Sequence, residues 1–246
     1  MDLAAHWIFP VHAVPRSGPL PEGGTSFDFK GPSGDRLVGT RCRPVDQPWD
    51  GTLLLGFGGN AWNAQDVATY LHEVFPAAEV ASFFYRGYTP SGGVPTADGL
   101  VADAPAEYDL MVDASRPKGG TAIGFSIGSA VAASLSASRK LDGLILVTPF
   151  DSLKALAQSF VPWIPLGPLV GHQIDAAAAV EKSKVATAII AAGRDEIVTA
   201  DRTQALRGRV PNLVYDKTLA RSGHNDIYAR SEFQLALREA AGRLIS

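Results

Sequence analysis

The stretch "TAIGFSIGSA", residues 121–130, determines how this chain is expected to fold. It places Ser126 midway between Gly124 and Gly128, in the pattern G-x-S-x-G. An apolar run enters the pattern and small residues leave it, which predicts a buried strand followed by a helix that packs closely on it. Ser126 is therefore expected at a sharp strand-to-helix turn, where flanking side chains would collide and glycines are needed.

Outward from this turn, the chain alternates between short apolar runs and longer segments with helical spacing. The runs expected to form strands are residues 25–30, 36–42, 52–57, 79–85, 121–125, 141–150, 186–193 and 212–217. The segments expected to form helices are residues 64–75, 97–115, 126–138, 176–183, 200–208 and 225–244. The first two strands read as an antiparallel hairpin, and the rest alternate with helices. This order predicts an α/β fold with a mostly parallel eight-stranded sheet and helices on both faces.

The length of 246 residues suits one large α/β domain. Residues 1–24 are rich in proline and glycine and show no clear period, so we expect an N-terminal arm that lies on the domain. Residues 25–246 are expected to form the single domain. Residues 151–172 break the alternation of strands and helices and are expected to form a short cap insert.

Composition excludes several classes of function. The net charge is −3 with no long basic run, which argues against nucleic acid as a partner. The single cysteine, Cys42, forms no internal disulfide and gives no sign of an oxidising compartment. The N-terminus lacks the pattern of a secretory signal, and no apolar stretch is long enough to span a membrane. We therefore expect a cytoplasmic protein with a small-molecule substrate; the oligomeric state is left open.

Ser126 is expected at the carboxyl edge of the sheet, where α/β proteins bind their ligands. A serine hydroxyl is a weak nucleophile and needs a base that a third group orients. When the serine lies at such a strand-to-helix turn, the nucleophile elbow, the expected order along the chain is serine, then acid, then histidine. Of the five histidines only His172 and His224 follow Ser126. His224 lies in "ARSGHNDIY", a loop after the last strand, whereas His172 falls in the irregular insert. We therefore interpret His224 as the base.

The acid that orients the base is expected at the end of another strand. Asp195 follows the apolar run "ATAIIAAG" in a glycine-containing turn, 69 residues after Ser126 and 29 before His224. We interpret Asp195 as the acid that orients the base His224. Glu196 is adjacent to it and Asp151 follows the preceding strand, so either carboxylate is an alternative.

With these residues in place, the sequence resembles the α/β-hydrolase superfamily, and most closely its compact, lid-poor branch of serine hydrolases and depalmitoylase-like proteins. The resemblance runs from about residue 26 to the C-terminus. Its motifs are "GGNAWN" (58–63), "YRGYTPSGGVPT" (85–96), "GFSIGSA" (124–130), "TPFDSL" (148–153), "AAGRDEIV" (191–198) and "SGHND" (222–226). It implies an α/β-hydrolase fold with a small cap.

The resemblance also implies a serine hydrolase that acts on a carboxylic ester or thioester through an acyl-enzyme. Ser126, Asp195 and His224 then form the catalytic triad, and the backbone N–H groups of Asn60 and Ile127 form the oxyanion hole. The branch usually reads H-G-N-A-G-N in this loop, whereas this chain has Trp62 before Asn63 in place of glycine.

Substrate contacts are expected from Trp62 and from two aromatic residues of the apolar insert, Phe150 and Trp163. The short insert and the bulk of Trp62 favour short to medium acyl groups. The alternative for the insert is ordinary packing against the sheet.

Two other functions stay open from the residues alone. One is a non-catalytic protein on the same fold, since a fold does not determine a function. The other is a dinucleotide-binding protein, because "GFGGNA" fits G-x-G-x-x-A after an apolar strand and Arg86 could meet a 2′-phosphate. No metal-binding motif is present, so we expect no metal and no cofactor.

Overall fold

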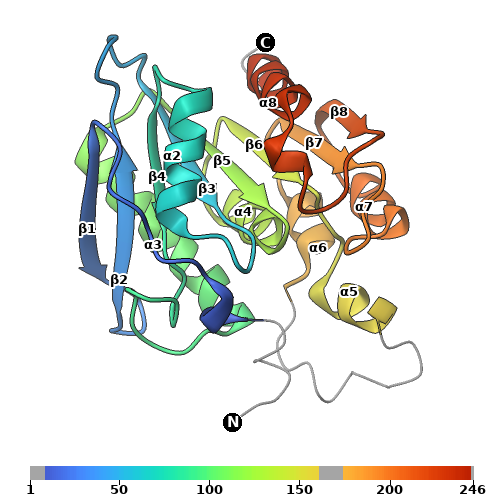
Figure 1. Ribbon diagram of the computed structural model, residues 1–246. Helices are drawn as coiled ribbons and strands as arrows, with labels where there is room; N and C mark the ends of the chain where they lie inside the picture. The colour runs from blue at the N-terminus through green and yellow to red at the C-terminus, as the bar shows by residue number, and fades with distance from the viewer. Residues whose placement is uncertain (1–8, 161–173, 245–246) are drawn as a thin grey trace. The chain divides into compact units, whose positions relative to one another are not determined.

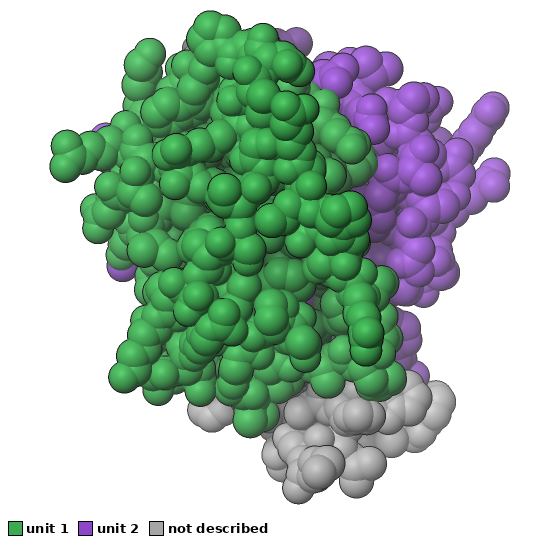
Figure 2. All heavy atoms as spheres, turned by 60° about the vertical axis from the view of Figure 1, so that its left-hand side comes forward, with its two compact units in different colours: residues 1–121 green, residues 122–246 purple. Residues whose placement is uncertain are grey.

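The computed structural model describes residues 9–160 and 174–244 (Figure 1). Contacts within the chain divide it into two compact units, residues 1–121 and residues 122–246 (Figure 2). The expected division into an arm, residues 1–24, and one domain, residues 25–246, stays a prediction.

The first unit is built on four strands that precede the Ser126 turn. They are β1 (Gly24–Lys30), β2 (Arg36–Cys42), β3 (Thr52–Phe57) and β4 (Glu79–Phe83). β1 pairs with β2 and β2 with β4 in antiparallel fashion, whereas β3 and β4 are parallel. All five residues of β4 are buried, as expected for a strand that is covered on both faces.

Two helices cover the strands of this unit. Helix α2 (Ala64–Val74) begins at Asn63, whose side chain caps it by accepting a hydrogen bond from the Gln65 N–H. Helix α3 (Ala97–Ser115) begins at Thr96, which caps it in the same way. Figure 1 shows α2 in front of the strands and α3 behind them. The segment before β1 contains a short 3₁₀ helix, η1 (Val11–Ala13).

The second unit carries the strands and helices that follow. Its strands are the end of β5 (Gly119–Phe125), then β6 (Gly143–Val147), β7 (Thr187–Ala192) and β8 (Leu213–Leu219). Its helices are α4 (Ile127–Ser138), α5 (Leu153–Phe160), α6 (Ala176–Lys182), α7 (Ala200–Arg207), η2 (Ile227–Ala229) and α8 (Ser231–Leu244). β6, β7 and β8 are parallel neighbours. Helix α8 packs on these three strands, and α4 packs on β6 and α6.

The strands form an eight-stranded sheet in the order β1-β2-β4-β3-β5-β6-β7-β8. The predicted fold class, a mostly parallel α/β sheet of eight strands, is confirmed. One expected helix differs: residues 225–244 do not form a single helix. The 3₁₀ turn η2 is separated from α8 by Arg230, whose backbone is extended, so the first residues after His224 take a tighter path.

The core of each unit consists of aliphatic and aromatic side chains from these strands and from the helix faces on them. Within residues 9–160 and 174–244, no helix combines the length and the apolar character needed to cross a membrane.

Candidate active site

Ser126 lies between the last residue of β5 and the first residue of α4, at a backbone φ of 52° and ψ of −118°. Positive φ is costly for any residue that has a β-carbon. Hydrogen bonds on both sides hold the turn. The Ser126 N–H donates to the Val147 carbonyl at 2.9 Å, and the Ser126 carbonyl accepts from the N–H and the hydroxyl of Ser129 at 2.9 and 2.6 Å.

Gly124 shows why the turn needs a residue without a side chain. A β-carbon at this position would lie 2.3 Å from the Gly128 carbonyl oxygen and 2.5 Å from the Ser129 Cα, both of them backbone atoms. The first turn of α4 therefore approaches β5 so closely that only glycine fits. Close approach, rather than an unusual φ, accounts for this glycine.

The strain at Ser126 leads to a prediction about stability. Ser126→Gly should have a free energy of unfolding about 1 kcal/mol higher than that of Ser126→Ala, since both variants lose the hydrogen bond between Ser126 Oγ and His224 Nε2 and differ in the strain at positive φ. Glycine relieves a strain of about 1–3 kcal/mol and costs about 0.5–1 kcal/mol in chain entropy. Urea unfolding of both variants measures the effect, with Ser126→Ala as the control because alanine keeps the β-carbon. An alanine variant as stable as the glycine variant would contradict this account.

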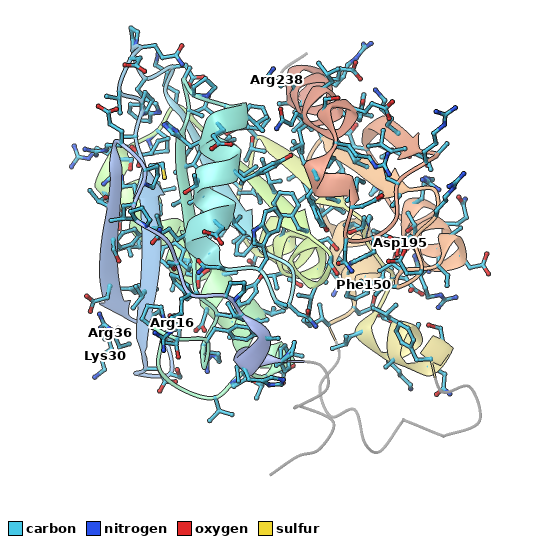
Figure 3. All side chains as sticks on the ribbon, viewed as in Figure 1. Arg16, Lys30, Arg36, Phe150, Asp195 and Arg238 are labelled. Carbon is cyan, nitrogen blue, oxygen red and sulfur yellow. The ribbon has the colours of Figure 1, made fainter. Side chains whose placement is uncertain are left out.

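Asp195 lies in the turn that follows β7, where Figure 3 labels it. Its Oδ1 accepts hydrogen bonds from the Ile197 and Val198 N–H groups at 2.9 and 2.7 Å. These two donors hold the carboxylate in one orientation. Gly193 lets the turn approach the next loop, since a β-carbon there would lie 2.6 Å from the Ala220 Cα.

His224 connects the serine to this carboxylate. Its Nδ1 lies 2.9 Å from Asp195 Oδ2 and 3.0 Å from Oδ1, and its Nε2 lies 2.9 Å from Ser126 Oγ. The side chains of His224 and Asp195 are only 6 % and 4 % exposed. The three predicted residues are therefore brought together in one hydrogen-bonded chain. When Nδ1 of His224 carries the ring proton and donates it to Asp195, the lone pair of Nε2 can accept a hydrogen bond from the Ser126 hydroxyl.

The two alternative carboxylates make other contacts. Glu196 Oε2 accepts a hydrogen bond from the backbone N–H of His224 at 3.2 Å, so it binds the main chain of the histidine rather than its ring. Asp151 forms an ion pair with Arg202 of α7 at 3.1 Å. The other candidate base, His172, lies outside the described residues.

Tyr228 is a neighbour of the site that the sequence did not indicate. Its hydroxyl lies 3.4 Å from Thr148 Oγ1, and its ring packs edge-on against Phe125. Burial, together with the nearby charge of Asp195, raises the pKa of Tyr228 to about 12, against the opposing effect of the Thr148 contact. The phenol therefore stays neutral beside Asp195. The only available signal was its position four residues after His224, within a segment expected to be helical.

The two predicted oxyanion donors lie in different units. Ile127 is the first residue of α4, a position whose N–H has no partner within the helix. Asn60 lies in the loop between β3 and α2, where the Trp62 N–H donates to the Gly59 carbonyl at 3.1 Å. The roles of both amides stay predictions.

The predicted substrate contacts have different surroundings. The Trp62 ring lies against Tyr70 of α2, with 5.8 Å between ring centroids. Phe150, labelled in Figure 3, is 1 % exposed and belongs to the core of its unit. Trp163 lies outside the described residues. The contact of these residues with substrate stays a prediction.

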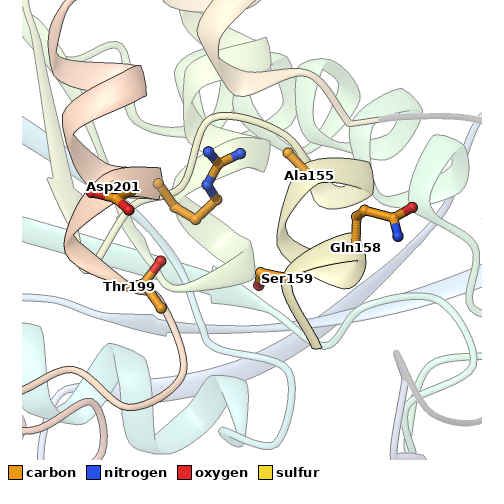
Figure 4. Close-up of a pocket in the computed structure, with 6 residues that line it drawn as sticks. Ala155, Gln158, Ser159, Thr199 and Asp201 are labelled. Carbon is orange, nitrogen blue, oxygen red and sulfur yellow. The ribbon is translucent and has the colours of Figure 1, made fainter. Parts of the chain in front are cut away.

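An open pocket of about 350 Å³ lies between α5 and α7 (Figure 4). It is lined by Ala155, Gln158, Ser159, Thr199, Asp201 and Arg202. Thr199 follows Asp195 by four residues, so the pocket begins close in sequence to the turn that holds this carboxylate.

Arg86, the residue that a dinucleotide-binding protein would use, already has a partner. Its Nε donates to Asp103 Oδ2 at 2.8 Å, and the Arg86 side chain is 12 % exposed. The hydrogen bond to Asp103 raises the pKa of Arg86. The guanidinium is therefore engaged inside its own unit, which removes the contact that Arg86 was to make with a 2′-phosphate.

Comparison with known proteins adds the following. No protein-family model matches the chain. It is 29 % identical over 223 residues to the protein named "Uncharacterized protein Rv2307c" of Mycobacterium tuberculosis, across 86 % of this chain and 78 % of that protein. Its structure is similar to that of esterase Pf2001 of Pyrococcus furiosus, with a TM-score of 0.75 and 17 % identity over 95 % of this chain and 99 % of the other.

An α/β hydrolase of Vibrio vulnificus is similar as well, with a TM-score of 0.73 and 18 % identity over 99 % of this chain and 92 % of the other. Identities this low are informative about the fold alone. The strand order, the turn at Ser126 and these structures agree, and the fold that the sequence motifs implied is confirmed: the chain has the α/β-hydrolase fold.

Proposed function

We propose that the protein is a serine hydrolase that cleaves an acyl bond, a carboxylic ester or a thioester. The observation that carries the proposal is the geometry at His224. Its Nε2 lies 2.9 Å from Ser126 Oγ, and its Nδ1 lies 2.9 Å from Asp195 Oδ2. The esterase among the similar structures supports it.

In the proposed reaction, Ser126 Oγ attacks the acyl carbonyl carbon while His224 Nε2 accepts the hydroxyl proton. Asp195 keeps Nδ1 protonated and stabilises the imidazolium that forms. The Ile127 N–H donates to the developing oxyanion, and the Asn60 N–H is expected from the sequence to be the second donor. His224 then protonates the leaving group, which departs and leaves an ester on Ser126. A water molecule, activated by His224, hydrolyses this ester and restores the serine.

A fluorophosphonate probe tests the proposal directly, because it forms a covalent bond only with an activated serine. Mass spectrometry of the labelled protein should find the adduct on Ser126. A non-catalytic protein with the same fold would carry no adduct there, and this outcome would reject the proposal.

The acyl group is expected to be short to medium in length. The insert between β6 and α6 is short, and Trp62 adds an indole to the proposed oxyanion loop. A panel of p-nitrophenyl esters below their micelle concentrations should give a higher kcat/KM for butyryl than for palmitoyl. A protein that buried a long acyl chain would instead favour palmitoyl, since each buried methylene stabilises binding by about 0.8 kcal/mol. A preference for palmitoyl would show that the protein does accommodate one.

A further inference from the structure

The loop between β3 and α2, residues 58–63, is held at its two ends by different parts of the first unit. At its start, the buried Tyr85 hydroxyl donates to the Gly58 carbonyl at 2.8 Å. At its end stands Asn63, which is 1 % exposed and caps α2 through Oδ1. The start of the loop is therefore bound by the segment that follows β4.

The end of the loop rests on the segment that precedes β1. The Asn63 Nδ2 group donates to the Pro15 carbonyl at 3.0 Å and to Ser17 Oγ at 2.7 Å. The Gln65 Nε2 group donates to the Gly18 and Pro19 carbonyls at 2.9 and 3.1 Å. Two buried amide side chains thus bind residues 15–19 across a sequence separation of 46 to 48 residues. Figure 3 labels Arg16 in this segment.

These hydrogen bonds attach an exposed segment to two buried side chains. Residues 15–19 are themselves exposed, whereas Asn63 and Gln65 beneath them are buried. Buried amide groups that lose their partners cost about 1–3 kcal/mol each. The segment and the first turn of α2 therefore stabilise each other, and the backbone of residues 58–63 is restrained at both ends.

We propose that residues 15–19 are a positioning element for the loop 58–63: by binding Asn63 and Gln65, they keep the Asn60 amide in the orientation that oxyanion binding needs. The inference rests on the proposed function, in which Asn60 is the second donor. It assigns a role to a segment that lies far from the triad in the sequence.

The test is the double variant Asn63→Asp, Gln65→Glu. Both changes keep the size of the side chain, and the carboxylate introduced at position 63 can still cap α2. Added negative charge at the start of a helix is favourable. The change removes the four amide donations and places carboxylate oxygens against the carbonyl oxygens of Pro15, Gly18 and Pro19, so that only the Ser17 hydroxyl can still donate to a carboxylate. Residues 15–19 should therefore be released while α2 is preserved.

Three readouts are expected to change. Amide hydrogen exchange should rise in residues 9–20 and also in residues 58–62. Labelling of Ser126 by a fluorophosphonate should slow about tenfold, less than the 10²–10³-fold effect of losing an oxyanion donor outright. In ester hydrolysis kcat should fall in proportion while KM stays within about twofold, because the oxyanion forms only in the transition state.

Asn212→Asp is the matched control. It makes the same chemical change at an exposed amide that donates to the Lys184 carbonyl, and it should leave all readouts unchanged. The single variant Gln65→Glu leaves the Asn63 contacts intact and should give an intermediate result. It also serves if the double variant fails to fold.

Each outcome bears on the inference. Release of residues 9–20 without change in residues 58–62 or in the labelling rate would overturn it, as would a segment that stays bound in the double variant. If wild-type Ser126 is not labelled at all, the proposed function fails instead, and hydrogen exchange in residues 58–62 still reports whether the segment holds the loop.

Discussion

Ser126→Ala should abolish nearly all ester turnover, with a fall in kcat of roughly 10³-fold or more. The hydroxyl oxygen is the atom that His224 Nε2 approaches to 2.9 Å, and alanine offers no nucleophile in its place. The measurement is steady-state hydrolysis of a p-nitrophenyl ester, together with mass spectrometry after treatment with a fluorophosphonate.

The alanine variant is a suitable comparison because the backbone conformation of the turn stays the same. Its β-carbon stays at positive φ, and the Gly124 contact with α4 is unchanged. Its circular dichroism should therefore match that of the wild type, and it should still unfold in urea in one cooperative transition. Turnover that persists at the wild-type rate in a folded alanine variant would end the serine-hydrolase interpretation.

Asp195→Asn should lower kcat by about 10⁴-fold, the scale of this change in other triads. Asp195 Oδ1 accepts from two backbone N–H groups, so the amide oxygen of asparagine must take that position. The NH₂ group then takes the position of Oδ2, 2.9 Å from His224 Nδ1. It donates to Nδ1, which moves the ring proton to Nε2. An Nε2–H cannot accept the proton of Ser126.

Glu196→Gln provides the matched control one residue away. It makes the same change from carboxylate to amide, but the glutamine oxygen can still accept from the His224 backbone N–H. Its kcat should stay within a few-fold of the wild type. If Glu196→Gln lost as much activity as Asp195→Asn, the orientation of the ring would depend on the charge of this turn and not on one carboxylate.

Most of the fold could be predicted because the signals that determine it are local. The strand at residues 36–42, the strand at 52–57 and the helix at 97–115 were expected at the bounds observed for β2, β3 and α3. Hydrophobic period and turn residues reflect interactions within a few positions of the chain, which is the range that sequence patterns record. The division of residues 225–244 was missed because it depends on the path of the chain after His224.

The residues of the candidate site were also recognisable one by one, from the ends of strands and from glycine-containing turns. The sequence favoured Asp195 as the acid and left Glu196 open, because the two are adjacent, carry the same charge and follow the same strand. The turn directs Asp195 Oδ2 to the His224 ring and Glu196 to the His224 backbone N–H. That difference arises from side-chain direction in a folded turn.

Contacts across long separations were beyond any local pattern. The sequence marked residues 1–24 as an arm, but nothing in it connected Pro15 and Ser17 with Asn63, 46 or more residues away. Local periodicity thus specified the order of strands and helices and the turn at Ser126. The choice of hydrogen-bond partners was settled only when β-strands and turns brought distant backbone groups within about 3 Å, because a hydrogen bond depends on distance and angle in space and leaves no spacing rule along the chain.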